Sequence, residues 1–313
     1  MELGKTPVAF FIFSRPRHTR MAFAAIRGYR PARLFLVADG PRETQALDAA
    51  RCQEVREIVS AVDWPCEVRT NFSSYNLGCS RRVSSGLDWV FSAADRAIVL
   101  EDDCVASPEF FLFCDELLEV YENNDSVWVV SGNSYQPEFK RGDGSYYFSK
   151  YPDCWGWATW RRSWRHYQNE LPFLDEWQRS RRWKECFPTV LERRYFNRLF
   201  HRVLDGSIDS WDYRWLACVI YGGGLAATPN ANMVRNIGFD AQGTHTTNRA
   251  NSPPHCPTQL GPMKHPTRVA PDRTADDYLR IVVEQRGWGG LLRRLPARAA
   301  RLIRRFAWAN RES

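Results

Sequence analysis

The sequence has no pair of cysteines at CxxC spacing, although nine cysteines are scattered along its 313 residues. Zinc ribbons and disulfide frameworks need closer or paired spacing, so neither is expected here. An odd, scattered set of cysteines instead indicates free thiols in a reducing compartment. We therefore expect the protein in the cytoplasm.

Long hydrophobic runs are also missing. Near the N-terminus the only apolar run, VAFFIF at residues 8–13, is too short for the core of a signal peptide and far too short to cross a bilayer. No other stretch reaches spanning length. Any membrane contact is therefore expected to be peripheral, at the inner face of the cytoplasmic membrane.

A broad excess of basic charge is missing as well, despite a net charge of +7. Residues 291–313 hold seven Arg and one Glu, which leaves 36 basic against 35 acidic residues in the rest of the chain. Because nucleic-acid-binding domains carry a basic face, we expect no nucleic-acid partner.

The basic C-terminal segment has helical periodicity. A helix from Pro296 would place apolar side chains on one face and Arg side chains on the other. The apolar face would hold Ala299, Leu302, Ile303 and Phe306, and the basic face Arg298, Arg301, Arg304 and Arg305. Residues 291–313 are therefore a candidate for peripheral contact with an anionic membrane. Packing on the domain, with the Arg face solvated, is the alternative.

Strands and helices alternate in the first part of the chain. Short apolar runs bounded by turn residues predict buried strands, and helical stretches lie between them. The strands are expected at residues 8–13, 32–38, 66–70, 96–100 and 126–132, and the helices at 17–29, 43–61 and 80–93. This alternation indicates an α/β fold with a mostly parallel sheet. After about Tyr146, helices are expected at 189–204 and 211–221.

Three consecutive acids, Glu101, Asp102 and Asp103, follow the fourth predicted strand directly. Ser107 and Pro108 suit the start of the next helix. The acids therefore lie at the carboxyl end of a strand, the edge where α/β sheets bind ligands. Like charges this close raise one another's pKa unless a cation, hydrogen bonds or solvent relieves them. We interpret the triplet as a candidate cation site, with a solvated acidic turn as the alternative.

Several short motifs occur in order along residues 7–250: SRPRH, ADG, YNLGCSRRVSSGLDWVF, LEDD, SPEFF, CWGWATW, SWDYRW and GFDAQGTH. Together they resemble nucleotide-sugar glycosyltransferases of the GT-A fold, in particular bacterial family 2-like enzymes and the N-acetylglucosaminyltransferases with an EDD motif. The resemblance implies a Rossmann-like, mixed but mostly parallel sheet with flanking helices. It implies a GT-A domain over residues 1–270, with a nucleotide-sugar-binding half at 1–132 and an acceptor-binding half at 133–270. A C-terminal helical extension follows at 271–313.

The same resemblance implies a metal-dependent, inverting enzyme. It would move a hexosyl or N-acetylhexosaminyl group from a UDP-sugar to a hydroxyl of a glycan or lipid-linked glycan in surface-polysaccharide synthesis. Two alternatives stay open: a sugar-phosphate nucleotidyltransferase, and a non-catalytic glycan-binding protein of the same fold. A nucleotidyltransferase usually needs a glycine-rich loop after the first strand, which FSRPRH lacks.

In the resembling enzymes the last acid of the triplet reaches the metal and the middle acid lies near the ribose. Carried over, Asp103 is the ligand of Mn²⁺ or Mg²⁺, Asp102 contacts the ribose or the metal, and Glu101 orients the loop. His245, in GTHTT, matches a late histidine that completes the metal site or touches the diphosphate. A surface histidine is the alternative. One or two carboxylates suffice because these metals keep positions for phosphate and water.

The residues around the ends of the first three strands are candidates for binding the nucleotide. They are Ser14, Arg15, Asp39, Asn76, Gly78 and Arg82. Asp39 would accept a hydrogen bond from the uracil or a ribose hydroxyl, and Arg82 would pair with phosphate. Alternatively, the DG and NLG sequences only form turns.

A transferase also needs a base and an acceptor platform. Asp212, in SWDYRW, matches the family position of the carboxylate that takes the proton of the acceptor hydroxyl. Asp209 is its competitor, or else caps the same helix. Trp157 and Trp211 are predicted to stack on a sugar in the acceptor site, with plain core packing as the alternative.

Overall fold

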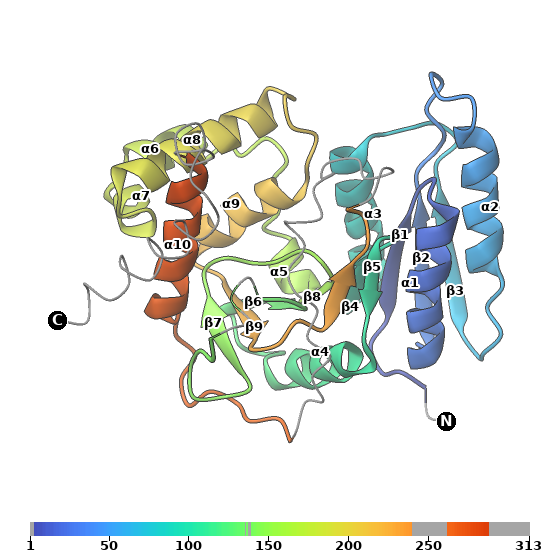
Figure 1. Cartoon of the computed structure of the whole chain (residues 1–313), viewed down its shortest axis with the longest axis horizontal. Helices are drawn as coiled ribbons and strands as arrows, with labels where there is room; N and C mark the ends of the chain where they lie inside the picture. Colours follow the sequence, from blue (N-terminus) through green and yellow to red (C-terminus); the bar gives the residue numbers. More distant parts are fainter. Residues whose placement is uncertain (1–2, 135, 137–138, 240–261, 288–313) are drawn as a thin grey trace, which may run out of the picture.

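The computed structural model describes residues 3–134, 136, 139–239 and 262–287, and these form one large sheet and one small one (Figure 1). The large sheet contains β1 (Val8–Ile12), β2 (Arg33–Ala38), β3 (Glu67–Phe72), β4 (Arg96–Glu101), β6 (Val127–Ser131), β7 (Tyr146–Ser149), β8 (Trp157–Trp160) and β9 (Leu225–Pro229). Their spatial order is β3-β2-β1-β4-β8-β6-β9-β7. The small sheet pairs β5 (Cys104–Ala106) with β10 (Val234–Asn236).

The large sheet is parallel through β3, β2, β1 and β4 and becomes mixed beyond them. Strand β8 runs antiparallel to both of its neighbours, β4 and β6. Beyond it, β6 and β9 are parallel, whereas β7 is antiparallel to β9. The predicted α/β class, with a mixed and mostly parallel sheet between helices, is confirmed.

Helices cover both faces of the sheet. One face packs against α1 (Pro16–Tyr29), α2 (Asp48–Ser60) and α4 (Pro108–Val120). The other face packs against α3 (Cys79–Ala93), α5 (Arg161–Trp164), α6 (Leu174–Arg179), α7 (Arg181–Cys186), α8 (Val190–Leu204) and α9 (Asp212–Gly222). The last described helix, α10 (Arg273–Gly287), packs against α8.

Strand β1 is a continuous apolar run because both of its faces are covered. Alternate side chains of a strand point to opposite faces, and both faces are covered here. Phe10 packs into the cluster that includes α1 and α2, and Phe11 packs into the cluster that includes α3. Both rings are buried. A strand with one solvated face would have alternated apolar and polar residues instead.

Two predictions about these elements were wrong in detail. The strand predicted at residues 66–70 as buried is β3, which lies at the edge of the sheet with Glu67, Val68, Arg69 and Thr70 exposed. The helix predicted from residue 43 begins only at Asp48, because the Asp48 carboxylate binds the backbone N–H and guanidinium of Arg42 and holds the intervening residues in turns.

No helix within the described ranges is long and apolar enough to cross a membrane. The amphipathic helix predicted in residues 291–313 lies outside the described residues.

Candidate functional site

The acidic triplet lies where the sheet topology brings β1 and β4 side by side. Phe11 of β1 is in register with Glu101, the last residue of β4, so the loops after both strands meet at one edge. From the β1 loop, Arg15 pairs with Asp102 through Nη2 and with Asp103 through Nη1, the latter at 2.9 Å from Oδ2. The Phe13 N–H also donates to Asp102, at 3.3 Å. The structure therefore brings together the predicted Arg15, Glu101, Asp102 and Asp103.

The charges in this cluster are unbalanced. Among the described residues, Asp102 and Asp103 both pair with the guanidinium of Arg15, which also lies within range of the charge of Glu101. Burial, followed by the charge of Asp103, raises the pKa of Glu101 to about 8, although Arg15 opposes the shift. Burial also raises the pKa of Asp102. A group whose ionised form is this unfavourable gains from any additional cation nearby.

A chain segment from the second half of the molecule lies against the triplet. Strand β10 pairs with β5, and the Ile237 N–H donates to the Asp103 carbonyl at 2.8 Å. A Cβ atom on Gly238 would lie 2.3 Å from Asp103 Oδ2, so a larger residue would displace that carboxylate. His18 Nε2 contacts the Ile237 carbonyl at 3.1 Å. His18 and Gly238 were not predicted as site residues, although Gly238 begins the motif GFDAQGTH.

Asp212 reaches the same edge from the other half of the chain. It is the first residue of α9, and its carboxylate contacts the Ser210 hydroxyl and the Cys154 thiol. Its negative charge contributes to the raised pKa of Glu101. The predicted base and Glu101 of the triplet therefore lie within range of each other's charge.

Cys79, at the start of α3, lies within range of the charge of several acids of the site. Burial raises the pKa of its thiol well above the usual value, and the charges of Glu101, Asp209, Asp212 and Asp103 raise it further. No single stretch of sequence contains these groups. The fold brings them together from the ends of β4, α3 and α9.

Asp209 caps a different helix from the one that follows it in sequence. Its carboxylate accepts from the Cys79 N–H and the Ser80 N–H, both at 2.9 Å. These are free N–H groups of the first turn of α3, so Asp209 caps α3 and not α9, which follows it in sequence. Sequence alone does not connect residues 130 positions apart.

Asp39 organises the loop between β3 and α3. Its two oxygens accept from the Asn76 amide at 3.0 Å and from the backbone N–H groups of Gly40, Leu77 and Gly78, at 2.8, 2.9 and 3.2 Å. Gly78 has a φ of +80°, a conformation that favours glycine. This geometry is the turn-forming alternative for the NLG sequence, and it brings Asp39, Asn76 and Gly78 together.

Ser14 and Arg82 are both buried. The Arg82 guanidinium donates to the backbone and side-chain oxygens of Asn71, at 2.6 and 3.0 Å. Its described hydrogen bonds therefore go to the end of β3. Burial lowers the pKa of Arg82, which the nearby Asp39 partly offsets.

Trp157 and Trp211 are packed inside the molecule. Their side chains are 1% and 2% exposed, and their rings stack on each other with centroids 5.3 Å apart. Trp164 and Trp215 complete this aromatic cluster. A buried ring has no free face for a sugar, so the geometry favours the core-packing alternative.

The triplet suits a divalent cation that takes part of its coordination from a ligand. Its donors are carboxylate oxygens, which Mg²⁺ and Mn²⁺ prefer, and its net charge is negative. Within the described residues, no three His, Cys, Asp or Glu side chains are grouped so that they could hold a metal by themselves. The predicted ligand His245 lies outside the described residues.

Comparison with known proteins gives only distant similarities. No family model and no curated protein matches the chain. Among solved structures, a mannosyltransferase from Pyrobaculum calidifontis in complex with GDP-Man and Mn²⁺ is 11% identical with a TM-score of 0.39, over 72% of this chain and 55% of that chain. A 4-diphosphocytidyl-2C-methyl-D-erythritol synthase from Anaerococcus prevotii is 10% identical with a TM-score of 0.34, over 70% of this chain and 97% of that chain. A UDP-glucose pyrophosphorylase in complex with UDP-glucose is 8% identical with a TM-score of 0.25, over 48% of this chain and 64% of that chain. At these scores the similarities do not decide between reactions, and the functional argument rests on the site.

Proposed function

We propose that this chain is a metal-dependent, inverting glycosyltransferase that uses a nucleotide sugar, with a UDP-sugar as the expected donor. The acceptor would be a hydroxyl of a glycan or lipid-linked glycan in surface-polysaccharide synthesis. The observation that carries the proposal is the convergence of Glu101, Asp102, Asp103 and Asp212 at one edge of the sheet, where Arg15 is the one cation that forms ion pairs with the triplet in the described part of the chain. A structural role alone would not require so much uncompensated negative charge.

The triplet supports the donor side of the reaction. Asp103 would hold Mn²⁺ or Mg²⁺, with His245 as a further ligand and Asp102 close to the ribose. When bound, the metal supplies Lewis-acid stabilisation of the charge that develops on the leaving diphosphate. The Asp102 carboxylate is fixed by Arg15 and the Phe13 N–H, so it is held in place before the donor arrives.

The loop after β3 supports the nucleotide end. Asp39 orders Asn76 and Gly78, and the first turn of α3 follows directly. We propose that this loop, together with Ser14 and Arg15 after β1, borders the nucleotide. Asp39 would act mainly by holding the loop, because both of its oxygens already accept hydrogen bonds from the protein.

Asp212 supports the acceptor side. The acceptor hydroxyl would give its proton to the Asp212 carboxylate while its oxygen forms the bond to the anomeric carbon and the bond to the diphosphate breaks. Asp212 is the first residue of α9, where the aligned N–H groups of a helix favour a negative charge. Ser210 and Cys154 fix its orientation. Attack from the face opposite the leaving group inverts the configuration at that carbon.

Thermal-shift measurements would test the proposal first. UDP-, GDP-, CMP- and dTDP-sugars would be compared with and without Mn²⁺, on the wild type and on Asp103→Ala. A bound ligand raises the melting temperature by mass action, so one nucleotide series should stabilise the wild type and lose its metal dependence in the variant. No response to any sugar nucleotide in the presence of metal would contradict the proposal.

The products then distinguish the alternatives. Release of a nucleoside diphosphate and an inverted glycoside supports the transferase. Release of pyrophosphate would identify a nucleotidyltransferase. Binding of a sugar nucleotide without turnover across many acceptors would identify a non-catalytic protein.

A further inference from the structure

Basic charge is concentrated in a second segment that the charge balance of the whole chain conceals. Residues 178–202 contain eight Lys and Arg and two Glu, and one of these acids, Glu192, is buried. When residues 291–313 are also set apart, the rest of the chain has 28 basic against 33 acidic residues. The molecule therefore divides into an acidic body and a basic segment built mainly from α7 and α8.

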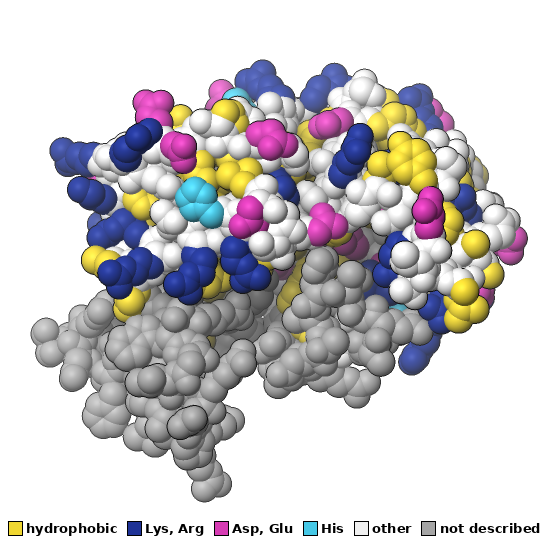
Figure 2. Space-filling model, turned by 90° about the horizontal axis from the view of Figure 1, so that it is seen from above, with side chains coloured by type: hydrophobic (Ala, Val, Ile, Leu, Met, Phe, Trp, Pro, Cys, Tyr) yellow, Lys and Arg dark blue, Asp and Glu magenta, His cyan; other side chains and the backbone are white. Residues whose placement is uncertain are grey.

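These helices form an open cavity of about 580 Å³, which we call the α7–α8 surface. Its lining includes four cations and no acid among the described residues: Lys184, Arg193, Arg194 and Arg198. Figure 2 shows Lys and Arg side chains gathered on this side of the molecule, with hydrophobic side chains between them. Because like charges repel, such a grouping costs stability unless an anion or solvent compensates it.

Three of the four cations are available to a partner. Lys184, Arg194 and Arg198 are exposed, and none forms an ion pair within the described part of the chain. In contrast, Arg193 donates to the carbonyls of Phe187 and Pro188, at 2.8 and 2.7 Å, and fixes the turn between the two helices.

Exposed apolar side chains lie beside these cations. Val190 and Leu191, at the start of α8, are 54% and 37% exposed. Val190 lines the same cavity as Lys184 and Arg194. The surface therefore combines positive charge with protruding aliphatic groups, which is the combination that inserts at the boundary between lipid headgroups and acyl chains.

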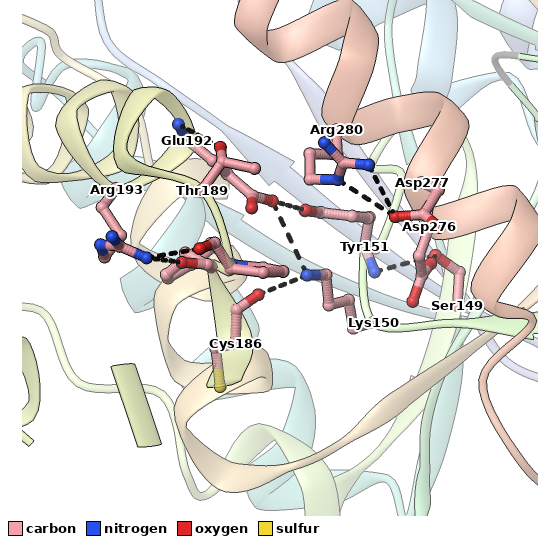
Figure 3. Close-up of polar contacts among 12 residues, drawn as sticks. Ser149, Lys150, Tyr151, Cys186, Thr189, Glu192, Arg193, Asp276, Asp277 and Arg280 are labelled. Carbon is pink, nitrogen blue, oxygen red and sulfur yellow. Dashed lines mark hydrogen bonds and ion pairs between the residues drawn. The ribbon is translucent and has the colours of Figure 1, made fainter. Parts of the chain in front are cut away.

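On their inward side, α7 and α8 are joined by polar contacts to the segment that follows β7 (Figure 3). The Glu192 carboxylate accepts from the Tyr151 hydroxyl at 2.6 Å and lies 3.7 Å from Lys150 Nζ. Lys150 also donates to the Cys186 carbonyl at the end of α7. The acid that would neutralise the cations of α8 is thus turned inward, and the outward face stays basic.

We propose that the α7–α8 surface binds an anionic phospholipid bilayer. A soluble phosphate is the weaker candidate, because its sites surround the anion with buried donors, whereas these cations are exposed and spread over an open surface. Helix α10 packs against α8 beside this surface (Figure 1). The proposal does not depend on the glycosyltransferase activity, because binding is measured without turnover.

Vesicle flotation of the full chain would test this proposal. We expect the wild type to float with vesicles of phosphatidylglycerol and phosphatidylcholine but not with pure phosphatidylcholine. The variant Lys184→Glu with Arg194→Glu and Arg198→Glu should lose on the order of a hundredfold in partitioning, because each cation near an anionic surface contributes substantially. A matched control is Lys5→Glu with Arg165→Glu and Arg268→Glu, which changes the net charge equally at exposed residues elsewhere.

Three results would overturn the proposal: equal binding by the two triple variants, equal binding to both kinds of vesicle, or wild-type binding to duplex DNA but not to the anionic vesicles.

The double variant Val190→Ser with Leu191→Ser adds an independent measurement. It keeps all the charges and should still weaken partitioning several-fold. Unchanged melting temperatures would show that each variant is folded.

Discussion

Two acidic groups in this molecule, the side chain of Glu192 and the triplet at residues 101–103, differ in how their charge is compensated. On the α8 side, Glu192 has Lys150 at 3.7 Å and the Tyr151 hydroxyl at 2.6 Å. At the sheet edge, Asp102 and Asp103 both pair with Arg15, the one cation paired with the triplet among the described residues, and burial with neighbouring charge raises the pKa of Glu101 to about 8. The first group is nearly balanced within the protein, whereas the second is not.

This difference separates a structural role from a functional one. Burying a charge is costly, so a carboxylate retained for stability is expected to have its counter-charge built in. Glu192 meets that expectation and connects α8 to the segment that follows β7. The triplet does not meet it, which favours a ligand that brings positive charge. Four variants test this comparison.

Changing Asp212 to Asn should produce the largest effect, and it should affect turnover. Removing a general base lowers the rate by about a thousandfold, because the acceptor hydroxyl keeps its proton. The measurement is nucleoside diphosphate release with the donor identified by thermal shift. Donor binding and melting temperature should stay near wild type. A variant that retains most of its activity would assign the base to another residue.

Changing Glu192 to Ala should lower the stability of the protein and leave donor binding intact. It removes the carboxylate that pairs with Lys150 and accepts from Tyr151, and leaves Lys150 with only the Cys186 carbonyl among its described hydrogen-bond acceptors, at a cost of about 3 kcal/mol in the free energy of unfolding. Urea denaturation measures this loss, while donor binding at low temperature should persist. The control is Glu192→Leu with Lys150→Met, which removes both charges and should recover most of the stability. If Glu192→Ala abolished donor binding in the folded protein, the comparison would fail.

Changing Asp276 to Asn should alter the pH dependence of stability. Asp276 accepts from the Ser149 hydroxyl at 2.6 Å, and burial raises its pKa to about 6. Because the unfolded chain releases this proton first, the wild type loses stability as pH rises from about 4 to about 6. The variant lacks this loss. Its free energy of unfolding, relative to that of the wild type, should therefore increase across that window by on the order of 2 kcal/mol. Denaturation curves with parallel pH dependence would disprove this assignment.

Changing Asp209 to Ala should produce the smallest effect. The variant removes the side chain that caps α3, which typically costs about 1 kcal/mol. Unlike Asp212→Asn, it should leave turnover within a few-fold of wild type once the protein is folded. A loss as large as that of Asp212→Asn would make Asp209 the base.

Local periodicity predicted much of the fold. Runs such as residues 8–13 are apolar because both faces of β1 are covered, so the strand is visible in the sequence. The position of Glu101 at the end of a strand follows from the same pattern. The exposure of β3 was not predictable in this way, because an edge position depends on which strands pair.

Contacts between distant segments could not be predicted. Asp209 caps a helix that begins at Cys79, and no local signal connects the two. Glu192 lies among arginines in sequence and reads there as part of a solvated charged face, yet the fold turns it inward. Trp157 and Trp211 illustrate the same limit, because stacking on a sugar and packing in a core require the same residue type.

The position of β8 has a consequence for how the chain folds during synthesis. Ala97 of β4 pairs with Thr159 of β8, and β8 then pairs with β6 on its other side. Until residues near 160 have left the ribosome, β4 and β6 cannot be joined, and both present unpaired edges. Such long-range pairing slows folding. Strand β4, which ends in the acidic triplet, therefore gains its second neighbouring strand late in synthesis. A fragment ending near residue 132 should aggregate instead of forming an independent nucleotide-binding unit.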